Sequence, residues 1–136
     1  MMKLKTTSEY ALRILTHMSL HEDEQHTAKE LSEKLQIPYK YLTRIMTNLS
    51  KFGFISSTRG KKGGFVFAKP ADEITLYAIL EAMNDLNDDV CIMGEGLCGE
   101  GEHCALHEHW SKPKQLIDEI FKNCTLKDLR KSPITV

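Results

Sequence analysis

Apolar residues recur at helical spacing in three stretches of the first half of the chain. The first stretch follows Thr6-x-x-Glu9 and the second follows Thr27-x-x-Glu30, a spacing typical of capping boxes at helix starts. The third begins after the break at residues 36–38, where Pro38 suits a first helical turn. The pattern predicts three helices with the buried positions Ala11, Ile14, Leu15, Met18, Ala28, Leu31, Leu35, Leu42, Ile45, Met46 and Leu49.

A β-hairpin is predicted after the third helix. Gly53 fits a helix terminator, and residues 54–58 and 65–67 then have the composition of two short strands. A glycine-rich tip with three cations lies between them. Helix, helix, break, helix and basic hairpin is the layout of a winged helix-turn-helix. We therefore expect a mainly α fold with a small β-hairpin.

Two further helices are predicted in the second half of the chain. One covers residues 74–86, and the other begins at about Ala105, with Pro113 expected to kink it or to start its main part. The second has more apolar surface than a surface helix of one small domain needs, with Trp110, Leu116, Ile117, Ile120 and Phe121. We interpret it as a dimerisation helix, because helix-turn-helix modules usually bind DNA as two-fold dimers. The alternative is that it folds back on its own domain.

The chain ends with a short element and a tail. The spacing Thr125-x-x-Asp128 predicts a last helical turn. Residues 132–136 are expected to form a loose tail. Cys124 is interpreted as a buried small apolar residue. The predicted organisation is a winged helix-turn-helix domain at 1–86, a cysteine-rich loop at 87–104, and the dimerisation helix with the tail at 105–136.

Charge is strongly segregated along the chain, although the formal net charge is only -1. From Lys34 to Lys69 every charged side chain is basic, and from Asp72 to Glu108 every one is acidic. A basic block suits a polyanion, so we expect a double-stranded DNA operator to bind the middle of the chain. The alternative is two solvated faces without a nucleic-acid role.

The predicted DNA contacts come from the third helix and the hairpin tip. The helix would enter the major groove, where arginine bonds guanine edges and lysine or tyrosine holds phosphates, and the tip would reach a neighbouring backbone or minor groove. The candidate residues are Tyr39, Lys40, Tyr41, Thr43, Arg44, Arg59, Lys61 and Lys62. Thr47 and Asn48 are also expected to face outward.

Length and composition restrict the class of protein further. With 136 residues, 41% of them hydrophobic, the chain can form one compact core with an appended element. No run approaches a membrane span and the N-terminus lacks a secretory signal, so we expect a cytoplasmic protein without membrane association. No set of nucleophile, base and orienting acid stands out, so an enzyme is not expected.

Three of the four cysteines lie in one glycine-rich segment that ends with a histidine. Cys91, Cys98, Cys104 and His107 form a candidate metal or iron–sulphur site, because cytosolic cysteines usually stay reduced. A structural zinc site is a second possibility, although only Cys104-x-x-His107 has the usual close spacing. His103 and His109 are expected to be solvated.

Four segments together resemble the IscR/NsrR-type family of winged helix-turn-helix iron–sulphur transcription regulators. They are S-E-Y-A-L-R-I-L near the N-terminus, I-P-Y-K-Y-L-T-R-I-M, the wing S-T-R-G-K-K-G-G-F, and the cysteine loop running into C-A-L-H-E-H-W. The resemblance implies a homodimer on a pseudo-palindromic operator, with one [2Fe-2S] or [4Fe-4S] cluster per subunit. It also implies repression or activation that responds to nitric oxide, redox or iron–sulphur status.

The resemblance extends to the ligands, with two departures. It implies that Cys91, Cys98 and Cys104 bind the cluster, with His107 or Glu9 of the partner subunit as the fourth ligand; for Glu9 the alternative is the capping role. The chain has C-x6-C-x5-C where relatives usually have C-x5-C-x5-C, which a glycine-rich loop tolerates. Thr43 stands where IscR-like members have glutamate, so their operator preference does not transfer. A cluster-free thiol sensor of the same fold is the alternative.

Overall fold

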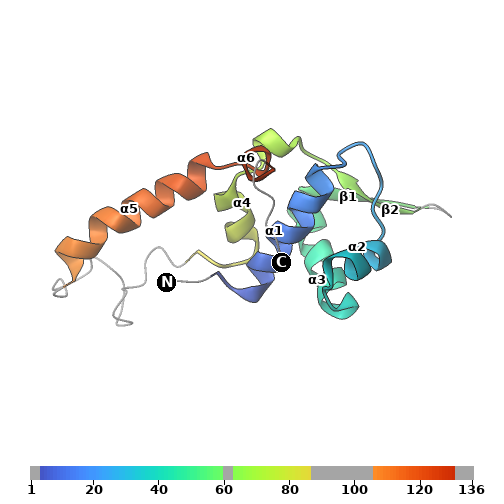
Figure 1. Cartoon of the computed structure of the whole chain (residues 1–136), viewed down its shortest axis with the longest axis horizontal. Helices are drawn as coiled ribbons and strands as arrows, with labels where there is room; N and C mark the ends of the chain where they lie inside the picture. Colours follow the sequence, from blue (N-terminus) through green and yellow to red (C-terminus); the bar gives the residue numbers. More distant parts are fainter. Residues whose placement is uncertain (1–3, 60–62, 87–105, 131–136) are drawn as a thin grey trace.

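The computed structural model describes residues 4–59, 63–86 and 106–130. Its centre is a bundle of three helices, α1 (Thr6–Ser19), α2 (Ala28–Leu35) and α3 (Tyr39–Lys51), in which α1 contacts both α2 and α3 (Figure 1). The expected apolar stripes meet in this core, with Ala28 and Leu35 packed at its margin. The fully buried large side chains of the three helices include Ile14, Leu15, Met18, Leu31, Leu42, Met46 and Leu49.

The turn between α2 and α3 is held by local bonds. The Thr27 hydroxyl caps α2 by accepting a hydrogen bond from the Glu30 backbone N–H (3.1 Å), as expected. At the other end, Gln36 takes a left-handed conformation (φ 53°), and the Ser32 hydroxyl donates to the Ile37 carbonyl at 2.6 Å. Pro38 is the N-cap residue of α3, so it stands just before the first helical residue. These contacts set the direction of α3 relative to α2.

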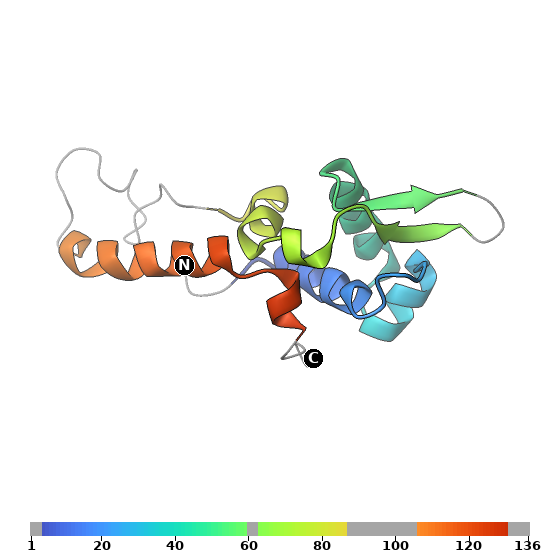
Figure 2. The ribbon, with the colours of Figure 1, turned by 90° about the horizontal axis from the view of Figure 1, so that it is seen from above.

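Gly53 ends α3 and directs the chain into the hairpin. Its φ of +81° suits glycine, and the Gly53 and Phe54 N–H groups bond the carbonyls of Ser50 and Leu49, which is the Schellman pattern. The strands β1 (Ile55–Thr58) and β2 (Gly64–Phe67) are antiparallel, with Ile55 opposite Phe67 and Thr58 opposite Gly64. Figure 2 shows the hairpin extending beyond the helices.

The chain between α1 and α2 is joined to the hairpin. His26 and Phe65 exchange two backbone hydrogen bonds, of 2.9 and 2.7 Å, in an isolated antiparallel bridge. A Cβ at Gly64 would lie 3.0 Å from the His26 carbonyl oxygen, so this strand position has room for little more than glycine. The base of the hairpin is therefore fixed against the helical core.

The C-terminal elements return to α1 except for one helix. The turn η1 (Ala71–Glu73) and α4 (Leu76–Ala82) follow the hairpin, and α6 (Leu126–Leu129) packs on α1 and η1. Thr125 and Asp128 form the predicted capping box of α6. The long helix α5 (His107–Asn123) contacts α4 and extends away from the rest of the molecule (Figures 1 and 2). Pro113 lies inside α5 rather than at its start.

Three local predictions were wrong. Thr6 is the first residue of α1 instead of its cap: Lys5 is the N-cap residue, no side chain caps the helix, and the Glu9 N–H bonds the Lys5 carbonyl. The predicted helix 74–86 is shorter, because Asn84 turns left-handed (φ 54°) after Ala82. Cys124 is half-buried rather than buried, and burial raises the pKa of its thiol. Residues 132–136 lie outside the described residues.

Candidate nucleic-acid interface

One face of α3 is free of the core and carries polar and aromatic side chains. Leu42, Ile45, Met46 and Leu49 face inward, as predicted. Tyr39 and Tyr41 are 58% and 54% exposed, and Lys40, Arg44, Thr47 and Asn48 are also exposed. Since exposed tyrosines combine a flat apolar ring with a hydroxyl, this face suits stacking and hydrogen bonding to a ligand.

Two threonines of α3 are less available than the sequence suggested. The Thr43 hydroxyl donates to the Lys40 carbonyl at 3.0 Å, and the Thr47 hydroxyl donates to the Thr43 carbonyl at 2.9 Å. Thr43 is also half-buried, not fully outward. Each hydroxyl still has lone pairs to accept a hydrogen bond, but its proton is engaged.

The cations of this face have no acidic partners. In the described part of the chain, neither Lys40 nor Arg44 forms an ion pair, and the segment from α3 to β2 contains no acidic side chain. By contrast, Lys34 on α2 is paired with Glu30 at 2.8 Å, and that hydrogen bond holds the pKa of Glu30 below its ordinary value. Unpaired exposed cations give α3 a positive surface that a phosphate backbone can neutralise.

The described end of the hairpin carries a further exposed cation. Arg59 is exposed directly after β1. The Thr58 hydroxyl closes the hairpin by donating to the Gly64 carbonyl (3.1 Å) and accepting from the Gly64 N–H and from the Gln25 side chain (both 3.0 Å). Lys61 and Lys62, which were predicted to contact DNA, lie outside the described residues.

The candidate iron ligands are only partly visible. Cys91, Cys98, Cys104 and His103 lie outside the described residues. His107 is the first residue of α5. His109 lies in the first turn of the same helix and is exposed, as expected. Glu9 is exposed in the first turn of α1, and within the described ranges its carboxylate has no hydrogen bond or ion pair. The capping role that was its alternative is therefore absent.

The chain leading into the cysteine segment is attached to the start of α1. The buried carboxylate of Asp85 accepts a hydrogen bond from the Lys5 backbone N–H at 2.9 Å, and the Lys5 ammonium donates to the Asn84 carbonyl at 2.7 Å. Residues 84–86 thus lie at the end of α1 that presents Glu9. Thiolate, imidazole and carboxylate groups are all suitable ligands for iron, so the donor set fits an iron–sulphur cluster.

Two features of the structure had no role in the sequence predictions. Asp85 was assigned only to the acidic block, although its buried carboxylate joins residues 80 positions apart. His17, His21 and His26 gather between α1, α2 and the hairpin, and the spacing H-x3-H-x4-H at the end of an apolar stripe is a signal that could have found them. In the residues that the structure covers, no three ligating side chains are arranged to hold a metal ion.

Comparison with known sequences gives consistent results. A family model described as "Rrf2: Iron-dependent Transcriptional regulator" matches residues 4–132. A protein of Aquifex aeolicus described as an HTH-type transcriptional regulator is 34% identical over 126 residues, which cover 90% of this chain and 88% of that protein. The HTH-type transcriptional regulator IscR of Erwinia tasmaniensis is 30% identical over 129 residues, covering 94% of this chain and 78% of the relative.

Solved structures share the fold. The global cysteine regulator CymR of B. subtilis has a TM-score of 0.83 at 24% identity, with 96% of this chain and 98% of that chain covered. IscR of T. potens has a TM-score of 0.76 at 23% identity over 96% and 87%. CymR of Staphylococcus aureus in its oxidized form has a TM-score of 0.76 at 27% identity over 98% and 100%. The expected mainly α winged-helix fold is confirmed. Of the helices in the described ranges, none is both long and apolar enough to span a membrane.

Proposed function

Because this chain belongs to the Rrf2 family of transcriptional regulators, we propose that it binds a pseudo-palindromic operator as a homodimer and that an iron–sulphur cluster controls this binding. Family membership makes the chain a transcription regulator and not an enzyme, as expected. The cluster, its signal and the dimer are the proposed parts. The observation that most directly supports control of the DNA-binding core by the cysteine segment is the contact of Lys5 with Asp85, which lies two residues before that segment.

DNA binding is assigned to the exposed face of α3 and to the hairpin. Arg44 would bond base edges in the major groove, while Lys40 and the tyrosines Tyr39 and Tyr41 would contact phosphates and sugars. Arg59, with Lys61 and Lys62, would hold a neighbouring stretch of backbone. The lack of acidic partners around Lys40 and Arg44 supports this assignment.

Control is assigned to the segment between α4 and α5. Cys91, Cys98 and Cys104 would bind the cluster, with His107 or Glu9 of the partner subunit as fourth ligand. When bound, an iron–sulphur cluster supplies a redox-active centre that also reacts with nitric oxide. Ligation would order a segment that begins beside the start of α1 and ends at the start of α5, so α1 and the helices packed on it would respond to its loss.

A second function is favoured by the structural neighbours. Two CymR structures resemble this chain. One is the global cysteine regulator of B. subtilis, and the other is the oxidized form of CymR from Staphylococcus aureus. Control by the cysteine thiols alone, without a cluster, is therefore the second candidate. A structural zinc site of the same residues is a third outcome that the experiment below detects.

The experiment measures visible absorption, bound iron and bound zinc of full-length protein purified without oxygen. The wild-type chain is expected to be coloured and to contain iron. Replacing Cys91, Cys98 or Cys104 with alanine should remove the colour and most of the iron while circular dichroism stays unchanged. A colourless wild-type protein with zinc would indicate a structural site, and one without metal would indicate thiol control.

The fourth ligand is identified by matched substitutions in the same assay. Glu9→Ala and His107→Ala are compared with Glu22→Ala and His109→Ala, which replace the same residue types at exposed positions elsewhere. Only the true ligand should shift the spectrum or make the cluster more easily lost. If all four variants keep the wild-type spectrum and stability, neither Glu9 nor His107 is a ligand.

A further inference from the structure

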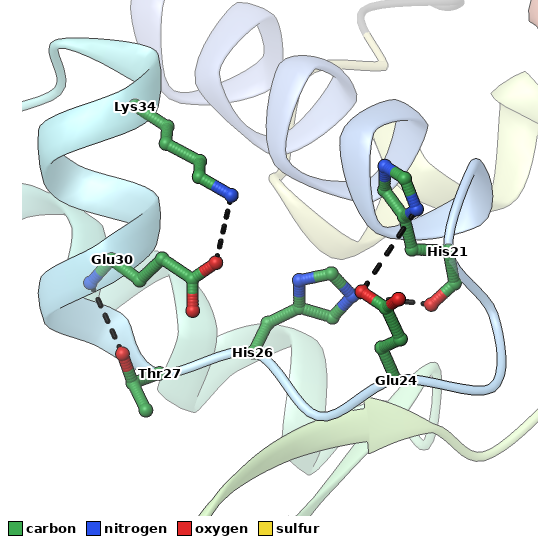
Figure 3. A network of polar contacts seen from close by, with 6 residues as sticks. All are labelled: His21, Glu24, His26, Thr27, Glu30 and Lys34. Carbon is green, nitrogen blue, oxygen red and sulfur yellow. Dashed lines mark hydrogen bonds and ion pairs between the residues drawn. The ribbon is translucent and has the colours of Figure 1, made fainter.

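Three histidines meet where α1, α2 and the hairpin join. His17 lies in the last turn of α1, and His21 and His26 lie in the connection to α2. The His17 ring is 5.8 Å from each of the other two, centroid to centroid, and the His21 and His26 rings are 6.3 Å apart. His26 is only 2% exposed. Figure 3 shows His21 and His26 with the neighbouring polar side chains.

The histidine rings have buried nitrogens without partners. His26 Nε2 lies 3.2 Å from the His21 carbonyl oxygen, and since a carbonyl only accepts, Nε2 carries the proton of the neutral ring. His26 Nδ1 is then the unprotonated nitrogen of the ring. Both His26 Nδ1 and His17 Nε2 are buried and have no hydrogen-bond partner among the described residues. A second proton on the His26 ring would therefore create a buried N–H group without an acceptor among the described residues.

The charged groups around His17 favour its neutral state on balance. Lys34 and Glu30 face them from α2 as an ion pair, and Glu24 lies near His21 at 3.9 Å in the connection (Figure 3). On α1, Arg13 donates to the Leu35 carbonyl, and from α6 Arg130 reaches Ser19 and Glu22. Burial lowers the pKa of His17, the charges of His26, Lys34 and His21 lower it further, and only Glu30 opposes them.

The same residues hold the hairpin. The backbone of His26 exchanges hydrogen bonds with Phe65 of β2, and the Gln25 side chain bonds the Thr58 hydroxyl at the end of β1. Thus the connection that carries His21 and His26 is bonded to both strands of the hairpin. Any movement of His26 away from α1 or α2 would be transmitted to β2, because little space separates Gly64 from the His26 carbonyl.

We propose that His17, His21 and His26 form a proton-sensitive joint, which holds the hairpin in its DNA-binding position only while the imidazoles are neutral. In acid, imidazolium rings about 6 Å apart repel one another and Lys34. The two His26–Phe65 hydrogen bonds then weaken, and the hairpin no longer presents Arg59 toward DNA in register with α3. This proton input is separate from the cysteine segment and requires only that the chain bind DNA.

The direction of the pH effect follows from the lowered pKa of His17. Between the folded value and the ordinary value of 6.5, the unfolded chain binds more protons than the folded chain. Stability is therefore fully present above the ordinary value and falls as the pH decreases through it. The same direction is expected for the neutral joint and for DNA affinity.

The first test follows the histidine rings and the Phe65 amide of the full chain by nuclear magnetic resonance during a pH titration. His17 is assigned with His17→Gln, and its midpoint is compared with the ordinary imidazole value of 6.5. His17 should titrate below that value, and the Phe65 amide shift should follow the His17 midpoint. A Phe65 amide shift that stays constant through that midpoint in the wild-type chain would overturn the proposal.

The second test measures DNA affinity at fixed salt from about pH 8 to about pH 5, because the pKa of His17 lies below the ordinary imidazole value. Added positive charge alone would tighten DNA binding in acid, whereas the joint predicts weakening by about 5-fold or more. His17→Gln with His26→Gln should lose this weakening, and His109→Gln should keep it. Tighter binding at low pH in the wild-type chain would disprove the joint, while absence of binding at pH 8 would instead contradict the proposed operator binding.

Discussion

Arg44 is the side chain of α3 best placed to distinguish one DNA sequence from another. It is exposed and has no ion-pair partner in the described residues. Lys40 lies one turn earlier on the same face of the helix. The planar guanidinium of arginine presents a rigid fork of donors that matches the guanine edge, whereas the lysine ammonium is a flexible point charge. Base recognition and phosphate binding are therefore expected to separate between Arg44 and the lysines.

Arg44→Ala should cost about 1–3 kcal/mol of binding free energy on the cognate operator and reduce discrimination against other sequences. Lys61→Ala, in the hairpin tip, should weaken all sequences alike and make binding less dependent on salt. Fluorescence anisotropy on cognate and random duplexes measures both effects, with Lys112→Ala on α5 as the control. Equal losses on both duplexes for Arg44→Ala and Lys61→Ala would contradict the assignment of base recognition to α3.

Helix starts differ in a way that the sequence alone did not distinguish. Thr6-x-x-Glu9 and Thr27-x-x-Glu30 have the same capping pattern, but only the Thr27 hydroxyl accepts a backbone hydrogen bond. At α1 the buried Asp85 carboxylate instead accepts from the backbone N–H of Lys5, the N-cap residue. A contact from a distant part of the chain thus replaces the local cap.

The two threonines form a matched pair for a stability measurement. Thr27→Ala should lower the free energy of unfolding by about 1 kcal/mol, since it leaves the Glu30 N–H without its acceptor. Thr6→Ala should cost clearly less, because no cap is lost. Urea unfolding followed by circular dichroism gives both values. A loss at Thr6 as large as that at Thr27 would show that the sequence pattern, and not the observed contact, describes α1.

The outer part of α5 has an apolar face without a covering partner among the described residues. Leu116 and Ile120 are 53% and 60% exposed and lie one turn apart. Helix α5 contacts α4 and otherwise extends away from its own domain (Figure 2). This arrangement argues against the alternative that α5 folds back on the domain. Exposed apolar side chains on a long helix are typical of a surface that another subunit covers.

If α5 is the dimerisation helix, Ile120→Asp should convert the dimer into monomers, because a charge would be buried in the contact. Sedimentation equilibrium measures the mass, and Glu119→Ala at the neighbouring exposed position should leave the dimer intact. A wild-type chain that is monomeric at all concentrations, or an Ile120→Asp chain that remains dimeric, would remove α5 from the interface.

At the scale of the whole molecule, the contact between Asp85 and Lys5 would connect the proposed sensing segment with the DNA-binding core. It joins the start of the cysteine segment to α1, which contacts α2, α3, α4, α6 and β2. A change at the proposed ligands would therefore have a direct route to the helices that position α3. If a cluster controls DNA binding, DNA binding should also affect the cluster, because coupling between two sites is reciprocal.

Linkage predicts that protein with and without the cluster differ in affinity for one operator at one salt concentration, by roughly 5–150-fold. Cys104→Ala should behave like the cluster-free protein. The control is Cys124→Ala, which removes a thiol outside the candidate ligand set. Equal affinities of the two forms on a verified operator would mean that the metal site stabilises the fold without controlling DNA binding.

The sequence by itself determined the elements whose signals are local. Helical spacing identified α1, α2 and α3 with their buried faces, Gly53 identified the end of α3, and the threonine patterns identified the starts of α2 and α6. These features depend on residues within one or two turns of each other, so the chain's local chemistry specifies them. The segregated charges likewise indicated where a polyanion would bind. Whether the predicted ligands meet stays a prediction, since the cysteines lie outside the described residues.

Tertiary structure decided the features that depend on distant contacts. The start of α1, the early end of α4 and the half-buried state of Cys124 each depend on elements that pack from elsewhere in the chain, such as the contact of Lys5 with Asp85. The attachment of His26 to the hairpin is of the same kind, because the bridge from His26 to Phe65 forms only after the chain has folded back. No local pattern encodes such pairings, since their free energy comes from burial and hydrogen bonds between segments that are remote in sequence.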